Sequence, residues 1–269
     1  YSLKNSRELG EFLSNITGGN IREVLELIKG FVGSPNVDSD KIISLMESDG
    51  DYVIPLHEFS KAALLGEYSH YDARSSLPLN IFDVRYPDKK EHFLSLLLIS
   101  YLLSDAPGKS AEGFVPTSDV IAELNRLGFV VDQAEHALRR LTNKKLIETT
   151  ERVTFDEGLQ GLVGDMPLAF RATTIGSYHC NRWAPTFAYM DTMLVDTPIL
   201  NPSTRQEISK NINSFDISKR LYRTKLFDEY LMQCWAEFTE HPVYFDWNIV
   251  RESGRKTFES VRRAVEKKW

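Results

Sequence analysis

Cysteine is scarce in this sequence: its 269 residues include only Cys180 and Cys234. The two lie far apart, and neither has a histidine or a second cysteine at the spacing of a zinc site. We therefore expect neither a disulfide framework nor a structural zinc. Both cysteines are interpreted as buried thiols of a protein in a reducing compartment.

Long apolar runs are also missing. The longest, from Phe93 to Leu103, is interrupted by Ser95 and Ser100 and is too short to cross a bilayer. It predicts a buried helix and no membrane segment. Because the sequence neither begins with methionine nor shows a signal-peptide pattern, we expect a truncated or processed, cytoplasmic protein.

No catalytic motif stands out. Gly108-Lys109-Ser110 resembles the end of a phosphate-binding loop, but Leu103 stands where that loop needs a glycine, and a helix is expected where it needs a strand. The acidic residues near position 45 lack the spacing of a calcium loop: Asp38, Asp40, Asp49 and Asp51. We expect no catalytic residue, no metal site and no cofactor of its own in this chain.

The composition, with 42% hydrophobic and 26% charged residues, is that of a globular protein of one large domain or two to three small ones. The net charge of −6 disfavours a dedicated nucleic-acid-binding protein, because such proteins need a basic surface to release the counterions of the phosphates. A local basic face remains compatible with this charge.

Apolar periodicity predicts a mainly α fold in four segments. Residues 1–67 show helical spacing between glycine- and proline-bearing breaks, which predicts a helical bundle. Residues 68–90 have little periodicity and predict an extended linker. Residues 91–178 follow the order of a winged helix-turn-helix with a small β-wing. Residues 179–269 predict a C-terminal helical region.

Two strands and one docked helix are expected within these segments. Residues 146–149 and 169–173 predict paired strands that flank the wing. The last helix is expected from about Asn248 to Lys268, with an apolar stripe that reaches Trp269. We expect this helix to dock through Phe258 and Val265.

The stretch from Gly18 to Arg22 opens a helix whose apolar residues, through Val32, are expected to face inward. Glycines allow unusual backbone angles, and the N–H groups at the start of the helix would then lie beside a guanidinium. Such a site suits a phosphate. Arg22 is therefore the candidate nucleotide-sensing residue; the alternative is a turn before a core helix with a solvated arginine.

Basic residues on the third helix of the winged segment are candidates for contact with DNA or a partner. This helix enters the major groove in DNA-binding members of the fold, and the wing contacts the backbone. Acidic neighbours make a solubilising face the alternative. The candidates are Arg139, Arg140, Lys144 and Lys145, with Arg152 near the wing.

With these pieces in order, the chain resembles the C-terminal part of AAA+ and related STAND-type P-loop ATPases, the helical lid followed by a winged helix of origin-recognition ATPases. The resemblance rests on Gly18 to Leu25, which is similar to the lid "sensor 2" pattern, and on the winged-helix order of residues 92–178. It implies that Arg22 reaches the γ-phosphate of ATP, and that ATP and Mg²⁺ are held by an N-terminal ATPase core. The family's phosphate loop and metal-binding acid are absent from this sequence.

These expectations combine into a non-catalytic regulatory and interaction region of a P-loop ATPase, which couples nucleotide state to a protein or DNA partner. The first alternative is a winged-helix DNA-binding protein, a replication or transcription regulator, without an ATPase link. The second is a free-standing scaffold.

Overall fold

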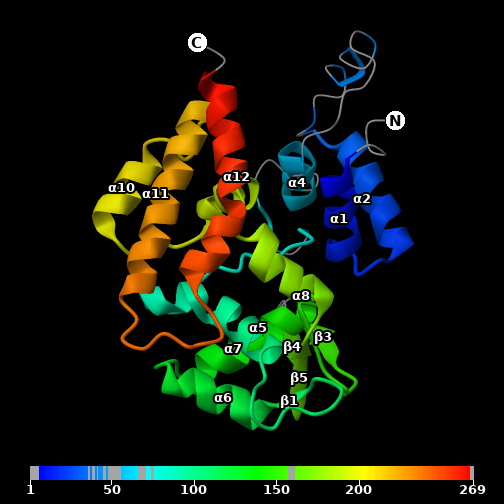
Figure 1. The fold of residues 1–269 in the computed structure, drawn as a ribbon, viewed down its shortest axis with the longest axis vertical. Coiled ribbons are helices and arrows are strands. Elements are labelled where there is room, and N and C mark those ends of the chain that lie inside the picture. Colours follow the sequence, from blue (N-terminus) through cyan, green and yellow to red (C-terminus); the bar gives the residue numbers. More distant parts are fainter. Residues whose placement is uncertain are drawn as a thin grey trace. The chain divides into compact units, whose positions relative to one another are not determined.

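The chain is mainly helical, as predicted, with its strands gathered in one part (Figure 1). The computed structural model describes residues 6–35, 37, 40, 42–44, 47, 56–65, 71–73, 76–156 and 161–266. Contacts divide the chain into two compact units, Tyr1–Pro78 and Leu79–Trp269. Each unit is described by itself.

The smaller unit is a helical bundle of α1 (Arg7–Ile16), α2 (Ile21–Gly33) and α4 (Leu56–Leu65). Ser6 caps α1 by accepting a hydrogen bond from the N–H of Leu9 at 3.2 Å. Aromatic rings form the centre of the bundle: Phe31 stacks on Phe59 at 4.8 Å, and Phe12 meets Phe59 edge-on at 6.1 Å. Asp38, Asp49 and Asp51 lie outside the described residues.

The expected inward face of α2 is only partly buried. Phe31 is buried, but Ile21 is 76% exposed, Leu25 61% and Val32 62%. α2 carries two apolar stripes, and α4 packs against the one that includes Phe31. The prediction that Ile21 and Leu25 face inward was wrong, because helical spacing does not say which stripe finds a neighbour.

The larger unit begins with a winged helix-turn-helix. Its sheet has the antiparallel order β1-β5-β2, so the last strand lies between the first two. The elements are α5 (Leu94–Leu103), β1 (Val115–Pro116), α6 (Thr117–Arg126), α7 (Val131–Asn143), β2 (Ile147–Glu148) and β5 (Ala169–Ala172). The two predicted strands are confirmed as β2 and β5, and β1 is an addition that the sequence did not predict.

Packing explains why this segment folds as it does. Nearly all of α5 is buried, Ser95 and Ser100 included, in agreement with its largely apolar sequence. The turn between α6 and α7 contains Gly128 at a φ of +93°, which a side chain would strain. Val130 precedes α7 as its N-cap, and the side chain of Gln133 accepts a hydrogen bond from the N–H of Val130 at 2.9 Å. The wing between β2 and β5 holds a hairpin of β3 (Thr154–Asp156) and β4 (Gly161–Val163), and β4 packs on α7.

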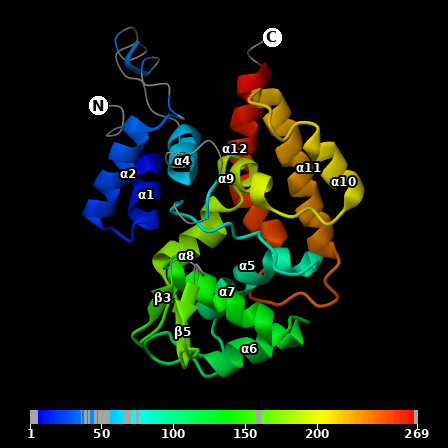
Figure 2. The ribbon, with the colours of Figure 1, turned by 180° about the vertical axis from the view of Figure 1, so that it is seen from behind.

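Helices form the rest of the larger unit (Figure 2). These are η1 (Lys89–Phe93), α8 (Thr174–Tyr178), the π-helix η2 (His179–Trp183), α9 (Phe187–Met193), η3 (Leu194–Asp196), α10 (Pro202–Ser209), α11 (Ile217–Ala236) and α12 (Trp247–Glu266). α11 and α12 lie side by side and are the two longest.

α12 docks as the sequence predicted. Phe258 and Val265 are partly buried against a core cluster of Phe187, Leu221 and Val261. At its midpoint α12 lies so close to the preceding segment that a Cβ on Gly254 would be 2.0 Å from the carbonyl oxygen of Pro185. Arg262 and Arg263 are exposed, and Trp269 lies outside the described residues.

Asp191 anchors α11 from within the core. Its carboxylate pairs with Arg220 at 2.6 Å and Arg223 at 2.9 Å, and all three side chains are largely buried. Arg223 also donates to main-chain carbonyls between α10 and α11, including that of Asn211 at 2.9 Å. One buried carboxylate therefore fixes both a helix and the loop before it.

The second half of the predicted linker belongs to the larger unit. Asn80, Ile81 and Phe82 are buried. The side chain of Asn80 donates to Thr197 at 3.0 Å, and the N–H of Ile81 donates to Tyr189 at 3.0 Å. The units divide inside residues 68–90, after Pro78, because the residues that follow carry buried apolar side chains.

The two cysteines and the longest apolar helix were both expected to be buried. Cys180 and Cys234 are both buried free thiols, as predicted. Among the helices of the described part, none has the length and apolar character that a bilayer crossing requires.

Candidate functional site

Arg22 lies in the first turn of α2, three residues after the second of two glycines in the left-handed region. Gly18 has a φ of +59° and Gly19 a φ of +80°, conformations that favour glycine over other residues. Asn20 follows as the N-cap, and its Oδ1 accepts hydrogen bonds from the N–H groups of Arg22 at 3.0 Å and Glu23 at 3.4 Å. The sequence therefore places Arg22 at a sharply defined helix start.

The Asn20 cap removes N–H donors from the expected phosphate site. We expected the first N–H groups of α2 to be open to a ligand, but Asn20 already occupies two of them. What remains is the guanidinium of Arg22, whose residue is exposed. Within the described part of the chain, no side chain pairs with it. The site thus offers one cation rather than a cradle of N–H groups.

Arg139 on α7 is bound to the wing. Its two terminal nitrogens donate to the carbonyl oxygen of Gly164 at 3.1 and 3.0 Å. Gly164 directly follows β4 and has a φ of +94°, so the wing turns sharply at the residue that accepts these bonds. Arg139 therefore holds the wing against α7.

Arg140, the next residue along α7, binds an acidic residue outside the wing. It pairs with Asp83 at 3.1 Å, and the two side chains are only 17% and 31% exposed. Burial raises the pKa of the Asp83 carboxyl above its ordinary value, although Arg140 opposes this. Burial, followed by the charges of Arg140 and Arg85, lowers the pKa of His136 to about 4, so this histidine is neutral at pH 7.

Residues 83–86, here called the arm, also contact the N-terminal end of α7. The hydroxyl of Tyr86 donates to Asp132 at 2.6 Å, and Arg85 lies 3.4 Å from the same carboxylate. Together with the pair formed by Arg140, these contacts fasten the arm along α7. The arm and the wing thus both bind side chains of the helix that was predicted to face DNA.

The other three predicted contact residues are placed differently. Lys144 is half-buried and caps the end of α7. Lys145 is exposed, with a φ of +56°, and Arg152 is exposed where the wing begins. The five basic residues are therefore not one continuous free face, and their role in binding DNA or a partner stays a prediction.

The buried histidines of the larger unit make hydrogen bonds within its core. His92 bridges the carbonyl of Phe82 at 2.6 Å and the hydroxyl of Tyr230 at 2.8 Å. Burial lowers the pKa of His92 to about 4 and that of His179 to about 3. Among the described residues, no three or more His, Cys, Asp or Glu side chains gather as metal ligands.

Sequence reasoning missed the partners of the two arginines. Asp83 lies in the predicted linker, and Gly164 lies in the predicted wing. Both are far from α7 along the chain, and no spacing rule joins them to it. A charged residue beside buried apolar ones, as Asp83 follows Ile81 and Phe82, was the one available signal.

Comparisons with known proteins identify no relative: no family model matches the sequence, and no curated protein or solved structure is significantly similar to it.

Proposed function

We propose that this chain is a non-catalytic regulatory and interaction region of a P-loop ATPase, in which Arg22 senses the nucleotide and the winged helix passes its state to a partner. The position of Arg22 carries the proposal. Its guanidinium is exposed at the start of α2, after two left-handed glycines, on a compact unit of its own.

This position suits a sensing role for physical reasons. A guanidinium presents donors in a planar fork that matches the oxygens of a phosphate. The N-terminal end of a helix adds a favourable dipole for an anion. Because Arg22 has no partner among the described residues, binding a γ-phosphate would break no described contact.

The contacts of α7 favour a protein partner over duplex DNA. In a winged helix that reads DNA, cations of this helix reach phosphates and base edges. Arg139 and Arg140 are bound instead to Gly164 and Asp83. DNA could recruit either arginine only by displacing the wing or the arm.

The test uses the natural gene product with the ATPase core that the proposal requires, on the same polypeptide or as a partner. Arg22→Ala should lower ATP hydrolysis roughly a hundredfold while ATP still binds, since one donor to the transferred phosphate is lost. Lys29→Ala, an exposed change on the same helix, is the matched control. Hydrolysis at the wild-type rate in Arg22→Ala, or a gene product with no phosphate loop and no ATPase partner, would show that the proposal is wrong.

A second measurement uses this chain alone. Calorimetric titration with MgATP should show no micromolar binding, because one arginine cannot replace a phosphate loop. Micromolar affinity would contradict the proposed division between core and regulatory region.

A DNA-binding protein without an ATPase link is the second candidate, favoured by the strand order β1-β5-β2 of a winged helix. Its duplex binding should be weak and nearly indifferent to sequence. Log affinity should fall with log salt with a slope of roughly −2 to −4, as for the release of a few counterions. Arg139→Glu combined with Lys144→Glu should abolish this binding, and unchanged affinity would remove α7 from the interface.

A further inference from the structure

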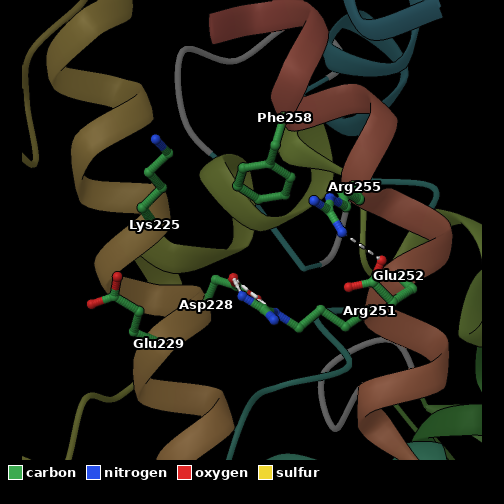
Figure 3. Close-up of a pocket in the computed structure, with 7 residues that line it drawn as sticks. All are labelled: Lys225, Asp228, Glu229, Arg251, Glu252, Arg255 and Phe258. Atoms are coloured by element: carbon green, nitrogen blue, oxygen red, sulfur yellow. Dashed lines mark hydrogen bonds and ion pairs between the residues drawn. The ribbon is translucent and has the colours of Figure 1, made fainter.

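A hollow of about 420 Å³ opens between α11 and α12 in the larger unit (Figure 3). Its lining consists of Lys225, Asp228 and Glu229 from α11 and Arg251, Glu252, Arg255 and Phe258 from α12. The volume lies within the range of small-molecule pockets, about 300–1,000 Å³. The hollow belongs to the larger unit, whereas Arg22 belongs to the smaller one.

An ion pair between Arg251 and Asp228, which carries no net charge, closes one side of the hollow. The Nε of Arg251 donates to the two carboxylate oxygens of Asp228 at 2.7 and 2.9 Å. This hydrogen-bonded carboxylate holds the pKa of Arg251 above its ordinary value. Asp228 is buried and its charge is matched, so it does not leave an uncompensated negative charge in the hollow.

Two cations flank the opening. Figure 3 shows Lys225 on the α11 side and the guanidinium of Arg255 on the α12 side, with the ring of Phe258 between them. Among the described residues, no carboxylate pairs with the ammonium of Lys225. The contacts of Arg255 with Glu252 at 3.3 Å and Glu259 at 3.2 Å are exposed, and such pairs hold their partners weakly.

Two further carboxylates, those of Glu229 and Glu252, line the hollow, so its lining carries as many carboxylates as cations. Glu229 lies one turn after Lys225 on α11, and Figure 3 shows its carboxylate pointing away from the hollow. Glu252 pairs with Arg255 at 3.3 Å, so Lys225 is the lining cation that no carboxylate of the described residues pairs with.

Phe258 provides a fixed apolar surface. Its ring meets Phe187 edge-on at 5.7 Å and packs beside Leu221 and Val261 in the core cluster. It is only partly buried, and its remaining surface lines the hollow. Because the ring is held by the core, a ligand that covers it does not have to order it first.

We propose that this hollow binds a small organic anion in which a flat apolar ring lies next to a phosphate or carboxylate. The ring packs on Phe258, and the anionic group lies between Lys225 and Arg255. Lys225 is exposed and Phe258 keeps part of its surface open. Arg255 would exchange its exposed ion pairs with Glu252 and Glu259 for the ligand. The inference does not depend on the role proposed for Arg22.

Ligand-observed NMR titration of the whole chain tests the site with phenyl phosphate and 2-naphthoate. Inorganic phosphate, which has no ring, and phenol, which has no anionic group at pH 7, should bind about tenfold more weakly than either probe, the change expected for losing one strong contact. Binding of phenyl phosphate alone identifies a phosphate ligand, and binding of 2-naphthoate alone identifies a carboxylate ligand. If neither binds at low millimolar concentration, the proposal is overturned.

Variants locate the binding. Lys225→Gln and Arg255→Gln change exposed residues and should each weaken the better probe by about tenfold, whereas Lys219→Gln, exposed on the same helix, should leave it unchanged. Phe258→Leu should weaken it as well. Equal affinity in Lys225→Gln, Arg255→Gln and the wild type would place the probe elsewhere and overturn the proposal.

Discussion

The guanidinium of Arg140 lies 3.1 Å from the carboxylate of Asp83 and joins α7 to the arm. Little of either side chain is exposed, so water screens the pair less than it screens an ion pair on the surface. The neighbouring Arg139 binds Gly164 of the wing. Two consecutive residues of α7 therefore hold two segments that are distant along the chain.

Replacing Arg140 should raise the pKa of Asp83 further. Burial already raises this pKa, and Arg140 is the main group that lowers it. The folded protein therefore favours protonated Asp83. The stability that this preference contributes is complete below the ordinary pKa of 3.8 and is lost as pH rises through the folded pKa. In Arg140→Gln that loss should extend to higher pH, and carboxyl-carbon NMR of Asp83 measures the shift.

The same variant should also lower stability at neutral pH, by about 1–3 kcal/mol, because a partly buried carboxylate loses its partner. Urea unfolding measures this change, with Arg152→Gln on the exposed part of the wing as the control. A pKa of Asp83 that stays constant or falls in Arg140→Gln would show that the pair does not govern it.

Arg139→Gln should loosen the wing. The variant removes two hydrogen bonds from a charged group to the carbonyl of Gly164, which together contribute about 1–2 kcal/mol at a half-exposed position. Amide hydrogen exchange of residues 161–165 should become roughly tenfold faster or more, whereas exchange in α5 should not change. Unchanged exchange in the wing would mean that β4 is held by other contacts.

Gly254→Ala should destabilise the larger unit although alanine favours helices. The new Cβ would lie 2.0 Å from the carbonyl oxygen of Pro185, so α12 would have to move away. We expect a loss of about 1–3 kcal/mol in thermal or urea unfolding. Gly10→Ala in α1, where a Cβ meets nothing within 4 Å, is the matched control and should stabilise its own unit by about 0.5–1 kcal/mol. If Gly254→Ala were more stable than the wild type, α12 could move away from Pro185 at little cost in free energy.

Stability should fall as pH drops from about 6.5 to 4. The pKa of His92 is lowered from 6.5 to about 4, and that of His179 to about 3, chiefly by burial. Their folded pKa values lie below the unfolded ones, so the unfolded chain takes up protons first, and stability is complete only above pH 6.5. His92 alone accounts for roughly 3 kcal/mol over that interval.

Unfolding midpoints measured across this interval test the prediction. His92→Gln should flatten the pH dependence, although it lowers stability at pH 7 by removing two hydrogen bonds. The exposed His241→Gln is the control for the substitution itself. If the stability of His92→Gln depended on pH as steeply as that of the wild type, groups other than His92 would be responsible for the pH dependence.

The helices and the winged-helix order could be predicted because they depend on local spacing. The largely apolar sequence of α5 marked it as buried, and the stripe through Phe258 and Val265 predicted how α12 docks. β1 escaped prediction because it has two residues, one of them Pro116, and only its pairing with β5 makes it a strand.

The candidate sites were harder to predict because they depend on contacts between distant residues. The sequence identified Arg22 and Arg139 but not that Asn20 would take the N–H groups beside the first, or that Gly164 would bind the second. Lys225 and Phe258 share a hollow only because α11 and α12 pack side by side.

The link between Arg223 and the loop after α10 has a consequence for how this protein can change during evolution. Arg223 binds the loop through main-chain carbonyls such as that of Asn211, which every amino acid possesses. The loop's shape is thus encoded largely in α11 and Asp191 rather than in its own side chains, and Phe215 in that loop is 84% exposed. Sequence drift between residues 210 and 215 should be tolerated, whereas Arg223 and Asp191 can change only together.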